Sequence, residues 1–86
     1  MQFTRITNQG ANTKPTSEAT LLTDLQEAVG GYIERVHLSG EYEGFYLIVN
    51  EEGLLADNPE QNMFASAIAG QPIVGDCAII KKEFFT

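Results

Sequence analysis

The spacing of hydrophobic and polar positions changes at two adjacent glycines, Gly30 and Gly31. Before them, apolar residues recur at the spacing of one face of a helix, which predicts a helix over Ser17–Val29. The predicted apolar face consists of Leu21, Leu22, Leu25, Ala28 and Val29. Three residues are candidates for its N-cap: Ser17, Thr20 and Thr23. One of the two glycines is expected to end the helix in the left-handed conformation, which costs other residues free energy.

After the glycines, side chains alternate as they do in strands. Tyr32–Leu38 is predicted to be a strand with Ile33, Arg35 and His37 on one face. Because charged and apolar side chains share that face, we expect it to be exposed to solvent, to pair with a partner or to line a pocket. Phe45–Val49 is apolar on both faces, which is typical of a central strand covered on both sides.

A hairpin is predicted to follow this central strand. Asn50–Gly53 fits a type I turn that begins with Asn50 and places Gly53 in the left-handed conformation. Leu54–Ala56 would then pair back antiparallel as the second arm of the hairpin.

A second helix is predicted to begin within Asn58–Gln61, where a cap residue and a first-turn proline precede an acid and a glutamine. Asn62 is a later alternative for the cap, and Gly70 is expected to end the helix. Four of its side chains are predicted to point into the core: Met63, Phe64, Ala67 and Ile68.

The two ends of the chain complete the predicted sheet. Phe3–Thr7 is expected to form a short strand at the edge, and Asn8–Thr16 has the composition of a mobile loop. Ile73–Ile80 is expected to be a largely buried strand, interrupted by a bulge or bend at Gly75–Asp76. Phe84–Phe85 should either fold back onto the core or contact another subunit.

These elements predict a single α+β domain over residues 1–86, with two helices on a mainly antiparallel sheet. The expected order is β-α-β-β-β-α-β, with residues 1–16 as a partly mobile strand and loop. A chain this short buries a small core and gains stability from association, so a homo-oligomer is expected. The predicted core consists of Leu21, Leu22, Leu25, Val29, Phe45, Leu47, Val49, Phe64, Ile68, Ile73 and Ile79.

Charge and composition exclude several classes of function. The formal net charge of -7 disfavours binding to nucleic acid or to anionic lipid. The carboxylates of the chain are too sparse for an acidic mimic of DNA. Cys77 is the only cysteine, so no internal disulfide is expected. The sequence shows neither a signal peptide nor an apolar run long enough to span a membrane, which gives a cytoplasmic location as the expectation.

Four short blocks in a fixed order resemble a family of small domains of unknown function found in bacteria, plasmids and phages. They are Val29–Glu34, Asn50–Gly53, Asn62 ahead of a small-residue helix, and Ile73–Asp76. The resemblance covers Leu25–Ile80 and implies no established activity. It implies a gene carried by a phage or mobile element, where small proteins often act in host takeover or anti-defence.

The residues that could carry chemistry have simpler structural explanations. Cys77 lies in an apolar run, where a thiol is usually a core group with a raised pKa. His37 is the only histidine, which supplies neither a metal pair nor a triad. Glu51 and Glu52 fit a solvated turn, and Asp76 is expected to cap backbone at its bend. An anion site would have to recruit some of Arg5, Lys14, Arg35, Lys81 and Lys82.

The sequence therefore favours a non-enzymatic, cytoplasmic binding protein that acts on another protein, either a host protein or a second copy of itself. No cofactor or metal is expected. Candidate binding residues are Arg35, His37, Asn50, Glu52, Asn62 and Asp76. Candidate interface residues are Ile33, Phe84 and Phe85. The alternative hypothesis is an oligomeric sponge for an anionic, nucleotide-like signal, and a small enzyme comes third.

Overall fold

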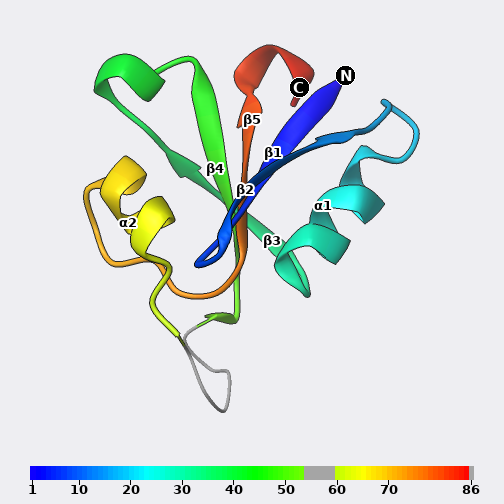
Figure 1. Cartoon of the computed structure of the whole chain (residues 1–86). Helices are drawn as coiled ribbons and strands as arrows, with labels where there is room; N and C mark the ends of the chain where they lie inside the picture. Colours follow the sequence, from blue (N-terminus) through cyan, green and yellow to red (C-terminus); the bar gives the residue numbers. More distant parts are fainter. Residues whose placement is uncertain (54–59, 86) are drawn as a thin grey trace.

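The computed structural model describes residues 1–53 and 60–85. Within them, one antiparallel sheet has the strand order β2-β1-β5-β4-β3, and the two helices lie on opposite faces of it (Figure 1). The strands are β1 (Gln2–Thr7), β2 (Gly10–Pro15), β3 (Ile33–His37), β4 (Phe45–Asn50) and β5 (Cys77–Lys81). The helices are α1 (Leu21–Val29) and α2 (Met63–Ala69), with the short 3-10 helices η1 (Gly40–Tyr42) and η3 (Lys82–Phe84). The predicted α+β class with an antiparallel sheet and two helices is confirmed.

The amino-terminal hairpin corrects the prediction of a loop over Asn8–Thr16. Instead, β2 pairs with β1 along its whole length, and this places β1 between β2 and β5 rather than at the edge. No side chain of β2 is buried, so the strand has no apolar face that the sequence pattern could reveal. Its ladder hydrogen bonds alone define it. The predicted hairpin arm Leu54–Ala56 lies outside the described residues.

Helix α1 begins later than predicted and ends where predicted. The hydroxyl of Ser17 bonds with that of Thr20, so these residues form a turn before the helix. The carboxylate of Asp24 accepts hydrogen bonds from the hydroxyls of Thr16 (2.6 Å) and Thr20 (2.8 Å), which lower the pKa of Asp24. Gly30 ends the helix in the left-handed conformation, with φ of 81°.

Each face of the sheet carries its own hydrophobic cluster. Strand β4 serves both, because Ile48 lies under α1 while Leu47 and Val49 lie on the face of α2. The predicted core residues that are buried are Leu25, Val29, Leu47, Val49 and Ile73. Those that are partly buried are Leu21, Phe45, Ile68 and Ile79. The prediction is wrong for Leu22, which is 57% exposed. Neither described helix is long and apolar enough to span a membrane.

Of the four α2 side chains predicted to point into the core, Ile68 does pack against it and the other three do not. Asn62, the later of the two candidates, is the N-cap, and its side chain accepts a hydrogen bond from the backbone N–H of Ala65. With the start fixed there, Ala65 is fully buried. Met63 and Phe64 are instead 63% and 53% exposed, and Ala67 is also exposed. The small side chain of Ala65 lets the helix lie close to the sheet.

Gly53 occupies its turn for a different reason from the predicted one. Its φ lies outside the left-handed range, so the prediction of a positive φ is wrong. A Cβ at this position would lie 3.2 Å from Cγ2 of Val74, which is closer than a relaxed contact. Gly53 therefore allows two segments to approach each other closely. The side chain of Asn50 does organise the turn, accepting a hydrogen bond from the backbone N–H of Glu52 (2.8 Å).

The predicted interruption at Gly75–Asp76 is confirmed, because β5 begins only at Cys77. Before the strand, Gly75 has φ of 78° and Val74 forms an isolated bridge with Gln61. After it, η3 turns the chain back so that Phe84 and Phe85 pack against the cluster under α1. Of the two alternatives for these aromatic residues, folding back onto the core is the one that the structure contains.

Candidate functional site

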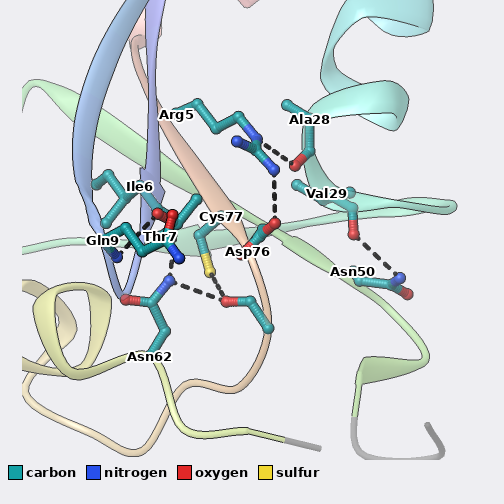
Figure 2. Close-up of polar contacts among 11 residues, drawn as sticks. Arg5, Ile6, Thr7, Gln9, Ala28, Val29, Asn50, Asn62, Asp76 and Cys77 are labelled. Carbon is teal, nitrogen blue, oxygen red and sulfur yellow. Dashed lines mark hydrogen bonds and ion pairs between the residues drawn. The ribbon is translucent and has the colours of Figure 1, made fainter.

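A polar cleft of about 580 Å³ opens where β1, α1 and β4 end and where β5 begins. Its walls come from segments far apart in the sequence, and Figure 2 shows their side chains converging from these segments. Three of the predicted binding residues line it: Asn50, Asn62 and Asp76. Glu52 lies beside it, in a neighbouring depression that shares Asn50.

An ion pair crosses this cleft. Nη2 of Arg5 donates to Oδ2 of Asp76 at 2.6 Å, and Nε of Arg5 donates to the carbonyl of Ala28 at 3.2 Å (Figure 2). The side chain of Arg5 therefore links the carboxyl end of α1 to the bend before β5. The prediction that Asp76 caps backbone is therefore wrong, because its carboxylate binds a guanidinium 71 residues away in the sequence.

The two asparagines of the cleft are tied to the protein's own backbone. Nδ2 of Asn62 donates to the carbonyls of Ile6 and Gly75, both at 2.9 Å, while its Oδ1 caps α2. Nδ2 of Asn50 donates to the carbonyl of Val29 at 3.3 Å. Because these amides already hold internal partners, the cleft acts as a junction of the fold rather than as a set of ligand groups.

The thiol that follows the cleft residue Asp76 in the chain is not reactive near neutral pH. Cys77 is fully buried, and its Sγ lies 3.3 Å from the carbonyl of Gly75. Burial, and then the negative charge of Asp76, raise the pKa of Cys77 to about 12. The thiolate that nucleophilic chemistry needs is therefore absent near neutral pH, as the sequence predicts.

A second group of side chains, which includes several predicted residues, lies near the carboxyl end of β3. We call it the cationic–aromatic patch and define it as Arg35, His37, Tyr46, Lys82 and Phe85. The guanidinium carbon of Arg35 lies 5.1 Å from the ring centre of Tyr46 and 5.3 Å from that of Phe85. Nζ of Lys82 lies 5.3 Å from the ring centre of Tyr46. The imidazole of His37 meets the same ring edge-on, with centres 5.3 Å apart.

The pairing of β3 with β4 creates this patch. His37 lies directly opposite Tyr46, and Arg35 is the next residue of β3 on the same face. The backbone N–H of Lys82 bonds to the carbonyl of Gly44, which fixes η3 beside the end of β4. The edge-on contact of Tyr46 and Phe85, with ring centres 5.9 Å apart, then closes the patch.

The charges of the patch are not neutralised within the part of the chain that the structure describes. There, the Arg5–Asp76 pair is the only salt bridge, so no carboxylate lies within 4.0 Å of the cations of Arg35 or Lys82. Arg35 and His37 are both exposed. Lys81 lies close by, with Nζ 5.9 Å from the ring centre of Phe84. Three of the five lysines and arginines therefore gather at this end of the molecule.

The nine predicted site residues thus divide between two places. Arg35, His37 and Phe85 belong to the patch, while Phe84 and Ile33 pack against the core beneath it. Sequence reasoning missed Tyr46, although its place opposite His37 follows once the hairpin of β3 and β4 is aligned. Within the described residues, no group of three or more metal-ligating side chains is present.

The structure is thus a small α+β domain with a five-stranded antiparallel sheet and two polar regions on its surface. The chain belongs to the family described as "Domain of unknown function (DUF3846)", which matches residues 3–84. This confirms the resemblance to a family of unknown function. The match extends past the predicted span of residues 25–80 at both ends, so it includes the amino-terminal hairpin and Phe84. Comparison with curated proteins and with solved structures gave no match.

Proposed function

We propose that this chain is a non-enzymatic binding protein that recognises an acidic surface on another protein through the cationic–aromatic patch. One observation carries the proposal. Arg35, His37 and Lys82 converge on the ring of Tyr46 in a chain whose formal net charge is -7. A concentrated positive site on a negative molecule attracts an acidic partner and selects its orientation.

The patch is held ready for binding. Two aromatic rings hold the guanidinium of Arg35 in place, and cation–π contacts of this kind contribute about 0.5–1 kcal/mol each at exposed sites. A fixed guanidinium loses less side-chain entropy on binding than a free one. Arginine and aromatic residues are also the types most enriched at the energetic centres of protein interfaces.

The state of the other reactive side chains supports a binding role over catalysis. The high pKa of the Cys77 thiol removes it as a nucleophile near neutral pH. The imidazole of His37 packs against Tyr46 on an exposed strand. The proposal also includes a cytoplasmic location and a host protein as partner, by analogy with small proteins of phages and mobile elements.

Affinity capture with a charge-reversed variant tests the proposal. Immobilised wild-type protein should retain a specific protein from a lysate of cells that carry the gene, and Arg35→Glu should lose it. Lys14→Glu is the matched control, because it makes the same charge change on the exposed side of β2. Retention by Arg35→Glu equal to that by the wild type would contradict the proposal.

A small anionic, nucleotide-like ligand is the second candidate. Two cations within 5.3 Å of one ring centre favour it, since phosphate and base could both find partners there. However, Arg35, Lys82 and His37 already surround the ring of Tyr46, so a base would have to displace one of them to stack. A rise in the melting temperature with ADP but not with adenosine, lost in Arg35→Glu, would favour this candidate over the first.

A further inference from the structure

Strand β3 forms one edge of the sheet, and its free side coincides with the patch. The register of β3 with β4 continues by one pair beyond the strand, where the N–H of Glu51 bonds to the carbonyl of Tyr32. Hydrogen-bonded and non-hydrogen-bonded pairs alternate in an antiparallel ladder. Glu34 and Val36 therefore bond toward β4, and the backbone groups of the alternate residues point away from it.

The alternate residues are Ile33, Arg35 and His37. Their backbone N–H and C=O groups face the open edge, and no backbone hydrogen bond of a turn, loop or cap among the described residues uses them. Their side chains lie on the face that carries the patch. A strand added to this edge would thus find free backbone hydrogen-bonding groups at the same three residues whose side chains lie on the face of the patch.

From this coincidence we infer that β3 accepts an extended acidic segment of a protein partner, which adds antiparallel as a sixth strand of the sheet. The inference rests on the proposed function and specifies its partner. In antiparallel addition, the partner residue opposite His37 precedes the one opposite Arg35 by two positions, and the one opposite Ile33 follows two positions later. The segment it fits has acid, any residue, acid, any residue, apolar residue, in that order along the chain.

Charge complementarity selects this occupant over a second copy of the chain. Side chains directly opposite each other in a sheet lie on the same face, which leaves three symmetric registers that align at least three residues of β3 with another β3. These registers bring together Glu34 with Glu34, Arg35 with Arg35, or Arg35 with His37. The first two place like charges opposite each other, and the third places Arg35 opposite His37 with no carboxylate. An acidic segment instead places a carboxylate opposite Arg35.

The opposite edge of the sheet lacks these features. Strand β2 ends in Pro15, which has no N–H to donate, and carries a single cation, Lys14. The aromatic residues that fix Arg35 have no counterpart among the residues of β2. The two edges therefore provide a comparison within one molecule.

A synthetic peptide tests the inference. The probe is a capped heptapeptide with the sequence Thr-Glu-Thr-Glu-Thr-Val-Thr. Its two glutamates and its valine face His37, Arg35 and Ile33 in turn. Fluorescence anisotropy at low salt should show binding to the wild type and to Lys14→Glu alike. Arg35→Glu should weaken binding about tenfold, because a like charge replaces an opposite one. Circular dichroism and thermal unfolding confirm that each variant is folded.

Backbone methylation separates strand addition from simple charge attraction. In an antiparallel ladder the residues opposite Ile33, Arg35 and His37 donate their N–H groups to β3, and the intervening threonines do not. N-methylation of the two glutamates should therefore abolish binding, while N-methylation of the two central threonines should preserve it. Both peptides keep the same charge and the same number of methyl groups.

The outcomes distinguish this inference from the proposed function. Equal binding of the two methylated peptides, with Arg35 still required, would overturn strand addition and leave recognition of acidic protein intact. Failure of the parent peptide to bind would also overturn the inference, while capture of a protein partner through Arg35 would still stand. Loss only from threonine methylation would overturn the antiparallel register.

Discussion

Asn62 connects three segments that are separate in the sequence. Its amide nitrogen donates to the carbonyls of Ile6 and Gly75, and its amide oxygen caps α2 through Ala65. Asn62 is only 1% exposed, and its bonds to Ile6 and Ala65 are buried. Removing the amide would take one donor from each of two carbonyls and the acceptor from one helix N–H, and lost hydrogen bonds at buried groups are costly.

We expect Asn62→Ala to lower the free energy of unfolding by about 2–4 kcal/mol, from the lost cap and the two lost hydrogen bonds to backbone carbonyls. Asn62→Asp keeps a capping oxygen but replaces the donor with a second acceptor, so it should not restore stability. Urea unfolding measures both, with Asn12→Ala on exposed β2 as the control. An Asn62→Asp variant as stable as the wild type would show that the cap is the only role of the residue.

Cys77 predicts a pH dependence of stability. Its pKa is raised from 9.0 to about 12, first by burial and then by the charge of Asp76. The unfolded chain therefore loses this proton at lower pH than the folded chain, so the stabilisation is complete below pH 9.0 and is lost as pH rises toward about 12. Between these values, the wild type should lose about 1.4 kcal/mol per pH unit more than Cys77→Ala. Identical slopes would contradict the burial of the thiol.

At the scale of elements, the sequence predicted where helices end better than which side they bury. Gly30 and Gly70 both end their helices in the left-handed conformation, because a local steric preference decides those positions. The buried face of α2 depends instead on Asn62, whose partners lie 56 and 13 residues away. The spacing of apolar residues within a helix carries no information about contacts this far apart in the sequence. Strand β2 was missed for a related reason, since it buries no side chain.

Leu47 and Leu22 test this arrangement as a pair. Both belong to the core predicted from the sequence, but Leu47 is 0% exposed in β4 and Leu22 is 57% exposed on α1. Leu47→Ala should lower the free energy of unfolding by about 2–5 kcal/mol, because it leaves a cavity. Leu22→Ala should change it by less than about 0.5 kcal/mol. Comparable losses from the two substitutions would contradict the placement of α1.

Across the whole molecule, the described cations other than Lys14 of β2 lie in two regions. Arg5 is neutralised by Asp76 in the polar cleft, whereas Arg35 and Lys82 have aromatic contacts and no ion pair among the described residues. The sequence identified Arg35 and His37 from their shared strand face. It did not identify Tyr46 as their common contact, because that requires the register of two strands. Its grouping of Asn62 with the binding residues overlooked the internal hydrogen bonds that only the fold reveals.

Self-association remains a prediction from the short chain length. Phe84 and Phe85 pack on the chain's own core, so any oligomer should use another surface in addition. Because self-pairing of β3 would align like charges, we expect Arg35→Glu to leave the oligomeric mass unchanged. Sedimentation equilibrium at micromolar concentration gives that mass. A single-chain mass of 9.4 kDa throughout would contradict self-association, and a mass altered by Arg35→Glu would place β3 in the interface.

Amide hydrogen exchange at β3, followed residue by residue with NMR, shows whether the open edge of β3 accepts an added strand. In the free protein, the amides of Glu34 and Val36 should exchange slowly and those of Arg35 and His37 rapidly, because only the former pair bonds toward β4. Addition of the acidic heptapeptide should slow exchange at Arg35 and His37 and leave β2 unchanged. Unchanged exchange at Arg35 and His37, with the peptide in saturating excess, would contradict the account.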